Sequence, residues 1–451
     1  MTAQRALSPF ETSYFSASAR FGSVPVAGMP LFIGSAVRGT VDAGLLRRAL
    51  AGLAAVHPLL RCRVVAEGGS MGGGALAFRL QEDFRPELDV TDVTGVTEGG
   101  EEAYFRLINS PQDWASGLFR GHLLRDGWSS RVVLVVHHGI ADGRSAFALL
   151  DEMWRRYTAL ASGTALPAPV ECRLPDAVDT RLASVVTDAE VTEFLDLLAR
   201  AAAGGPEPAT LRPDGDGTAD DSLGRFALDR IELDTATTEA LVATARAHGL
   251  TVNGLLCGAV LAAVRARLAP EAGALPMICG NAADLRSSLR PELPASTVLN
   301  CASGLGTMLA VDAGADPVAL GREVCADVRG ALARRDPARF LLAAQRVRSA
   351  QEAAALRAQP TIAVSNVGRI PRHPTPAGLS VVRDEVYAMA EGMPPKLTAF
   401  TYDGRLTVQV EYDTAVHGRA RMRRLGRDLE AALRKVALAF TREPAVSGPR
   451  V

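Results

Sequence analysis

Apolar residues follow the spacing of helices and strands in turn along the first part of the chain. Residues 43–56 repeat leucine and valine at intervals of three and four, which predicts an amphipathic helix, and Asp42 just before them is an N-cap candidate. Residues 131–136 (RVVLVV) form a continuous apolar run, which is typical of a strand covered on both faces. A second amphipathic helix is predicted to open at Ser145, after a turn that contains glycine.

The same alternation returns after the polar stretch of residues 204–222, which reads as a linker. Thr251 is an N-cap candidate for an apolar helix, and a basic helix is expected over residues 419–440. The turn Asp403-Gly404 between two apolar segments predicts a hairpin with a type I′ turn. The strands expected in this part are residues 224–233, 277–279, 361–364, 397–402 and 406–412. Both halves are therefore predicted to be mixed α/β.

The chain has 451 residues, more than one hydrophobic core usually holds. We therefore expect two domains with a boundary near the polar linker. The predicted division is an N-terminal subdomain over residues 1–180, a helix and crossover linker over residues 181–222, and a C-terminal subdomain over residues 223–451.

Composition excludes several classes of function. The net charge of −1 lacks the basic excess of a general nucleic-acid binder. The six cysteines form no CxxC pair, which argues against a disulfide framework or a structural zinc site. No apolar run reaches the roughly 18 residues that a membrane span needs, and the N-terminal residues lack the apolar core of a secretory signal. A cytoplasmic protein without a membrane span is expected.

The segment HHGIADG, residues 137–143, is the most informative part of the sequence. It directly follows the apolar strand and precedes a helix, so a histidine there is held rigidly at the end of a sheet. Histidine has an unperturbed pKa of about 6.5, which suits proton removal near neutral pH. Since consecutive strand residues point in opposite directions, one of the two histidines is expected to be structural. A metal site is the weaker reading, because no HExxH or third-ligand spacing accompanies the pair.

This segment resembles the HHxxxDG motif of the condensation-domain acyltransferase superfamily, which includes peptide condensation domains and the polyketide-associated (Pap-type) acyltransferases. The resemblance covers nearly the whole chain. Five further segments are similar to family patterns: Leu7-Ser8-Pro9, His57–Arg61, Gly117–Arg120, Asp284-Leu285-Arg286 and Ser365–Gly368. The plant-type DFGWG segment is absent, so the Pap-type branch fits better.

The resemblance implies a fold class and a set of roles. It implies an α/β chain with two chloramphenicol-acetyltransferase-like subdomains, arranged as a V-shaped pseudo-dimer with an active-site tunnel between them. His138 would be the general base in the tunnel and His137 a packing residue. Asp142, followed by Gly143, would form a structural ion pair with Arg286. Two further residues, Ser365 and Asn366, are candidates to contact the substrate or the developing oxyanion, although an Asn turn that closes a strand is an equal alternative.

The expected activity is transfer of an acyl group from a thioester to a hydroxyl, which forms an ester in polyketide or lipid-like biosynthesis. The thioester would arrive on an acyl carrier protein or on coenzyme A, and no bound cofactor and no metal are expected. An amine acceptor, as in stand-alone peptide condensation, would give an amide instead. A non-catalytic recruitment module is a third possibility, although the intact His138, Asp142 and Gly143 argue against it.

Overall fold

The computed structural model describes most of the chain. The described ranges are residues 3–16, 20–66, 75–93, 99–166, 173–215, 224–268 and 273–442. The predicted linker therefore lies partly outside the described residues, as do Cys172 and the predicted boundary between residues 222 and 223.

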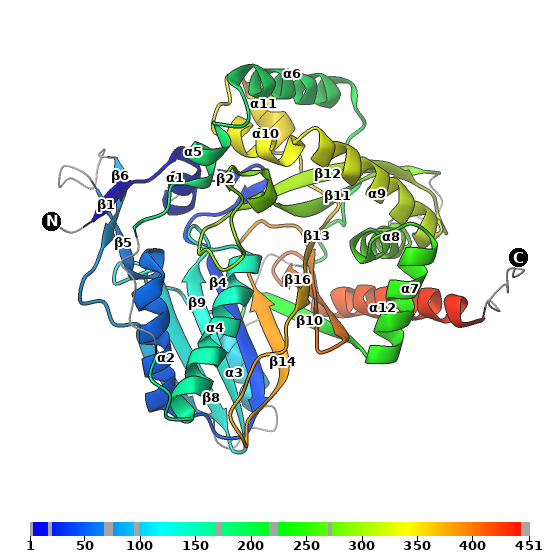
Figure 1. The fold of residues 1–451 in the computed structure, drawn as a ribbon. Coiled ribbons are helices and arrows are strands. Elements are labelled where there is room, and N and C mark those ends of the chain that lie inside the picture. Colours follow the sequence, from blue (N-terminus) through cyan, green and yellow to red (C-terminus); the bar gives the residue numbers. More distant parts are fainter. Residues whose placement is uncertain are drawn as a thin grey trace, which may run out of the picture.

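A five-stranded sheet, in the order β14-β4-β9-β8-β7, forms the centre of the first half. Its pairs are antiparallel except for β7 and β8. Helices α2 and α4 lie on one face, in front of the strands in Figure 1, and α3 contacts the other face. The elements are β4 (Pro30–Arg38), α2 (Ala43–Val56), β7 (Leu88–Asp92), α3 (Gly99–Ile108), β8 (Phe119–Asp126), β9 (Ser129–His137), α4 (Gly143–Ala161) and β14 (Ser380–Tyr387).

Strand β9 shows why the run RVVLVV is apolar throughout. Val132, Leu134 and Val136 pack into the core shared with α2 and α4, whereas Val133 and Val135 pack into a second cluster with residues of α3. Alternate side chains of a strand point to opposite faces, so a strand buried on both faces needs apolar residues at every position. The prediction of a strand covered on both faces is confirmed.

A six-stranded sheet, in the order β10-β16-β15-β13-β11-β12, forms the second half. One face packs against four helices, which Figure 1 shows together on the right. The elements are β10 (Phe226–Leu233), α7 (Thr235–Ala247), α8 (Val252–Arg265), β11 (Leu275–Asp284), β12 (Ala302–Val311), α9 (Pro317–Ala333), β13 (Ile362–Ile370), β15 (Lys396–Tyr402), β16 (Arg405–Asp413) and α12 (Arg419–Arg442). The predicted hairpin is confirmed: β15 pairs antiparallel with β16, and Asp403 and Gly404 both have positive φ, 47° and 79°.

Smaller elements complete the chain. Figure 1 shows α6, α10 and α11 side by side at the top of the molecule, where α6 contacts both of the others. The smaller elements are β1 (Gln4–Ala6), α1 (Pro9–Phe15), β2 (Arg20–Phe21), β3 (Val24–Pro25), η1 (Pro58–Arg61), β5 (Cys62–Ala66), β6 (Leu76–Leu80), α5 (Val178–Leu182), α6 (Asp188–Gly204), η2 (Arg286–Ser288), α10 (Asp336–Ala343) and α11 (Ala350–Leu356).

Strand β14 joins the sheet of the other half. It comes late in the chain, within the predicted C-terminal subdomain, yet it pairs antiparallel with β4 of the first half. The Ser35 hydroxyl of β4 donates a hydrogen bond of 2.7 Å to Asp384 of β14, between residues 349 positions apart. The two halves are therefore connected by a shared sheet as well as by the chain.

Several predicted element bounds differ from the structure, and two of the differences have a direct physical reason. Helix α4 begins at Gly143 rather than Ser145, because Asp142 is its N-cap and accepts a hydrogen bond from the Ser145 N–H. Strand β11 extends well beyond the predicted residues 277–279 at both ends. After Ile278, its residues toward the cavity are Gly280, Ala282 and Asp284, so this part of the strand has no alternation of large apolar side chains to detect.

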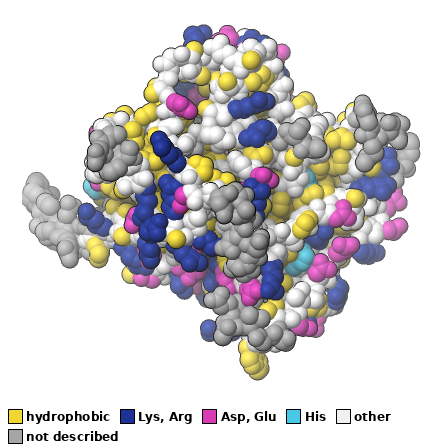
Figure 2. All heavy atoms as spheres, turned by 180° about the vertical axis from the view of Figure 1, so that it is seen from behind, with side chains coloured by type: hydrophobic (Ala, Val, Ile, Leu, Met, Phe, Trp, Pro, Cys, Tyr) yellow, Lys and Arg dark blue, Asp and Glu magenta, His cyan; other side chains and the backbone are white. Residues whose placement is uncertain are grey.

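Charged side chains of both signs share the surface. Figure 2 shows Lys and Arg side chains gathered on part of the back face, with Asp and Glu side chains beside them. No single described helix has the length and hydropathy to cross a membrane. Helices α7 and α8 have the required length and hydropathy only when taken together, and this pair is bent by 98°.

Candidate active site

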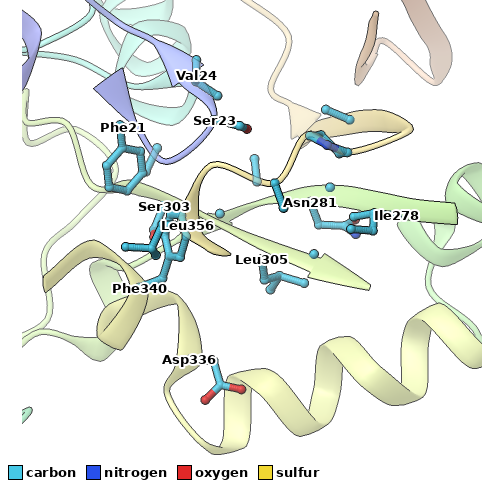
Figure 3. Close-up of a pocket in the computed structure, with 18 of the residues that line it drawn as sticks. Phe21, Ser23, Val24, Ile278, Asn281, Ser303, Leu305, Asp336, Phe340 and Leu356 are labelled. Atoms are coloured by element: carbon cyan, nitrogen blue, oxygen red, sulfur yellow. The ribbon is translucent and has the colours of Figure 1, made fainter. Parts of the chain in front are cut away.

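A cavity of about 730 Å³ opens between the N-terminal segments, α6 and the helix-free face of the second sheet. Figure 3 shows Phe21, Phe340 and Leu356 together on one side of it, with Ile278 and Leu305 along β11 and β12. Most of its wall is apolar. Polar groups are few, as in sites that hold an apolar ligand and orient it through a small number of contacts. The polar lining residues include His138, Ser303, Ser365 and Lys396.

His138 lies in the wall of this cavity, directly after β9. Its backbone is fixed from both sides, since its N–H donates to the Met29 carbonyl at 2.9 Å and the Asn300 side chain donates to its carbonyl at 2.9 Å. The Tyr14 ring lies 5.8 Å from the imidazole. Nδ1 of His138 is shielded from solvent, so Nε2 is the ring nitrogen that can meet a molecule in the cavity.

The surroundings of His138 favour the neutral imidazole. Burial lowers the pKa of His138, and the charge of Lys396 lowers it further. The backbone carbonyls of His138 and Ala141 and the carboxylate of Asp142 oppose this change without reversing it. A neutral imidazole at pH 7 can accept a proton, which a general base must do.

His137 occupies the opposite side of the chain and is 1% exposed. Its ring stacks on Phe15 at 4.1 Å and meets the edge of Trp114 at 4.8 Å. Its Nδ1 accepts a hydrogen bond from the Gly139 N–H. Burial, with the neighbouring His138, lowers the pKa of His137 to about 3, so it stays neutral and packs inside the protein. His137 does not line the cavity.

Asp142 and Arg286 form the buried ion pair that the resemblance implied, although they are 144 positions apart. Arg286 donates from Nη1 to Asp142 Oδ2 at 2.6 Å, and both side chains are at most 5% exposed. Burial disfavours the charge of Arg286, but Asp142 outweighs it and raises the pKa of the guanidinium. Arg286 also donates to the carbonyls of Thr297 and Leu299.

The carboxylate of Asp142 is fully engaged away from the cavity. Oδ2 accepts the Cys301 N–H at 2.8 Å in addition to Arg286, and Oδ1 accepts the Ser145 N–H at 2.9 Å. Asp142 is not among the cavity-lining residues, and Gly143 after it is the first residue of α4. These contacts connect the turn after His138 to the second half of the chain.

Ser365 and Asn366 lie inside β13, and not after a strand as the sequence suggested for Asn366. The pairing of β13 with β15 shifts register between Asn366 and Gly368, where Gly368 has φ +93°. Asn366 Oδ1 accepts the Gly368 N–H at 3.0 Å, so this side chain supports the bulge. Ser365 lines the cavity, whereas Asn366 does not.

The second half of the chain matches a family model. Residues 222–411 match the model described as the phthiocerol/phthiodiolone dimycocerosyl transferase C-terminus. The dimycocerosyl transferase of Mycobacterium leprae is 26% identical over 313 residues, which cover 66% of this chain and 68% of that protein. The Mycobacterium tuberculosis protein of the same name is 26% identical over 310 residues, 66% of this chain and 68% of its own.

Solved structures show the same fold over almost the whole chain. Polyketide synthase associated protein 5 from Mycobacterium tuberculosis matches with a TM-score of 0.73 and 18% identity, over 98% of this chain and 100% of that one. The first condensation domain of the calcium-dependent antibiotic synthetase matches with a TM-score of 0.69 and 18% identity, over 97% and 96%. The chain is thus similar in sequence to the dimycocerosyl transferases and shares the fold of the Pap-type and condensation-domain proteins. It has the two chloramphenicol-acetyltransferase-like subdomains of that fold.

Residues around the HHGIADG segment were missed by the sequence analysis. Asn300 holds the His138 carbonyl, and Tyr14 lies beside the imidazole, yet both come from distant segments with no local signal. Lys396 had a weak signal, because it is one of only two lysines among 49 basic residues. Among the described residues, no group of three His, Cys, Asp or Glu side chains is arranged to hold a metal ion.

Proposed function

We propose that this chain transfers an acyl group from a thioester to a hydroxyl and forms an ester, with His138 as the general base. The observation that carries the proposal is the position of His138: a histidine kept neutral, with Nε2 available to a mostly apolar cavity. The dimycocerosyl transferases to which the chain is similar are acyltransferases by name, which supports the same reaction class.

The proposed reaction needs no covalent intermediate on the protein. His138 Nε2 accepts the hydroxyl proton while the hydroxyl oxygen bonds to the thioester carbon. The tetrahedral intermediate then collapses, the carbon–sulfur bond breaks, and the imidazolium returns the proton to the departing sulfur. A cavity that holds both substrates makes this attack effectively unimolecular.

The apolar wall favours a lipid-like acyl chain or alcohol, because burial of apolar surface contributes about 25 cal/mol per Å². We therefore place the reaction in lipid or polyketide assembly. The donor thiol would be coenzyme A or the phosphopantetheine of a carrier protein. The predicted V-shaped arrangement with a tunnel between the subdomains, and a cytoplasmic location, are part of this proposal.

The test offers the purified protein palmitoyl-coenzyme A or a palmitoyl carrier protein with 1-octanol or octylamine. We expect release of the donor thiol and formation of the octyl ester, and loss of both in His138→Ala. Formation of the amide alone would favour the peptide-condensation alternative. A folded wild type that gives neither product with either donor would support the recruitment module instead.

A further inference from the structure

One row of residues crosses the cavity face of the second sheet at right angles to its strands. Gly306 of β12 pairs with Gly280 of β11, Gly280 with Ala363 of β13, Ala363 with Lys396 of β15, and Lys396 with Glu411 of β16. Residues paired across strands project from the same face. The row is therefore a floor of very small residues that ends at a lysine and a glutamate.

The space beside these glycines differs from one to the next. Gly304, in the next row, has no neighbour closer than 3.9 Å to where a Cβ would stand, whereas a Cβ would lie 3.3 Å from Pro360 at Gly280 and 3.2 Å from Ile278 at Gly306. Glycine inside a strand weakens it, so backbone geometry does not account for these positions. All three glycines line the cavity, so a substrate can lie close to the backbone of the sheet there.

Lys396 is held at the inner end of this floor. Its Nζ lies 2.8 Å from Glu411 Oε2 and 3.3 Å from Thr398 Oγ1, and its side chain is 12% exposed. The Glu411 side chain is 0% exposed. An ammonium group has three N–H donors. The described residues give Lys396 one hydrogen bond, to Thr398, and one ion pair, with Glu411, so donor capacity remains for a molecule in the cavity.

Lys396 also fills a role that the expected residue leaves open. Asn366 does not reach the cavity, so the predicted amide donor to a developing oxyanion is missing there. Apart from His138 and Lys396, the described basic residue on the cavity wall is Arg334. It is 55% exposed and pairs with Asp336. Among the described residues that line the cavity, Lys396 is the largely shielded lysine or arginine that shares it with His138.

We propose that Lys396 donates a hydrogen bond to the thioester carbonyl oxygen of a substrate lying across the glycine floor, and that Glu411 positions its ammonium group. This inference rests on the proposed acyl transfer. When the hydroxyl oxygen bonds to the carbonyl carbon, the C=O electron pair moves onto oxygen, and Lys396 stabilises that charge without giving up a proton. The pair returns to re-form C=O as the carbon–sulfur bond breaks, and the proton passes through His138 alone.

A second consequence concerns His138. The positive charge of Lys396 contributes to keeping His138 neutral. Removal of that charge therefore raises the pKa of His138, and the acid limb of the pH–rate profile moves to higher pH. This shift tests the electrostatic interaction between Lys396 and His138, whereas the change in kcat tests Lys396 as a hydrogen-bond donor.

The experiment compares Lys396→Met, Glu411→Gln and the double variant Lys396→Met/Glu411→Gln with the wild type, using palmitoyl-coenzyme A and palmitoyl carrier protein with 1-octanol. The double variant removes both charges, so it avoids an unpaired buried carboxylate and serves as the stability-matched form. We expect its kcat to fall ~10²–10³-fold, the loss typical of one oxyanion donor, with KM changed much less. Lys396→Arg should recover part of kcat, and the acid limb of the double variant should move to higher pH.

Two outcomes overturn different claims. A folded double variant with kcat within about threefold of the wild type, or a loss confined to KM, would overturn the role of Lys396, because an oxyanion donor acts on kcat. His138→Ala is assayed in parallel. An active wild type that loses activity in His138→Ala keeps the proposed function whatever Lys396 does, whereas an inactive wild type with both donors overturns both.

Discussion

His138 and His373 are two shielded histidines whose surroundings differ mainly in their access to carboxylates. His373, from the loop before β14, lies between Asp151 of α4 at 3.0 Å and Asp384 of β14 at 2.9 Å. Burial alone would lower the pKa of His373, but these two hydrogen bonds outweigh it and raise the pKa to about 9. His138 has no such partner, and its pKa is lowered. His373 is therefore a fixed cation, and His138 is a neutral base.

The opposite pKa shifts of His138 and His373 do not depend on whether an aspartate lies nearby in the sequence. Asp142 is only four residues from His138, yet Arg286, the Cys301 N–H and the Ser145 N–H occupy its carboxylate. Arg286 thereby keeps His138 free of a carboxylate that would hold it protonated. The ion pair across the two halves is thus an electrostatic condition for the proposed chemistry as well as a structural contact.

The largest effect is expected from breaking that ion pair. Arg286→Ala leaves the buried Asp142 without a cation, which costs about 3–5 kcal/mol of unfolding free energy. Asp142→Ala should also destabilise the protein but by less, because Arg286 keeps its ion pair with Asp284 at 3.0 Å. The double variant should lose less than the sum of the two single variants. Thermal melts and activity per folded molecule decide the matter. An Asp142→Ala protein that melts like the wild type but is inactive would make Asp142 catalytic.

The next effect tests the charged histidine. His373→Ala leaves Asp384 with only the Ser35 hydroxyl, because Asp151 keeps its ion pair with Arg155 at 2.6 Å. We expect a loss of about 3 kcal/mol, at the lower end for a broken buried pair. Denaturant unfolding measures it, and kcat per folded molecule should stay unchanged. His373→Ala/Asp384→Asn, which removes the stranded charge, should recover part of the stability. A loss of activity without a loss of stability would contradict the division between the two histidines.

The neutral histidine is tested by activity. His138→Ala should lower kcat/KM by at least ~10²-fold, the usual size of a general-base contribution, with the melting temperature unchanged. His137→Ala is the matched control: it removes the contacts with Phe15 and Trp114, so it should cost stability and far less activity per folded molecule. Equal and severe losses of activity in two well-folded variants would show that both histidines take part.

The smallest effect is a difference in pH dependence. Because the pKa of His138 is lowered from 6.5, kcat/KM should be flat around neutral pH and fall only in more acidic solution. Because the pKa of His373 is raised to about 9, its stabilisation is fully present below pH 6.5 and is lost as the pH rises through about 9. Melting temperatures from pH 6 to 10, for the wild type and His373→Ala, should converge on the alkaline side. Parallel curves would contradict the assignment of charge to His373.

The sequence predicted those parts of the fold whose residues face an apolar core. The run in β9 and the hairpin at Asp403-Gly404 were found because burial on both faces and positive φ leave direct traces in residue type. Most of β11 was missed, since its cavity face carries Gly280 and Ala282 in place of apolar side chains. Strand β14 was missed altogether. Its partner lies hundreds of positions earlier, and no local pattern encodes such a pairing.

The candidate site was predictable where a motif spans neighbouring residues. The opposite placement of His137 and His138 follows from strand geometry, and the resemblance supplied the pairing of Asp142 with Arg286. Asn366 was assigned to the site from its segment. Its side chain instead accepts a hydrogen bond from the Gly368 N–H and supports the bulge in β13. Lys396 was missed, because only the register of five strands brings it to the end of the glycine floor.

Strand β14 limits how this molecule can be divided or rebuilt. If residues 380–387 were lost, β4 would become an open edge with a row of unpaired N–H and C=O groups, which invites pairing with other chains and aggregation. A first half expressed alone, or fused to the second half of a relative, would lack its own last strand. Chimaeras that exchange the second half should therefore retain residues 380–387 of this chain, or supply the strand as a separate peptide to complete the sheet.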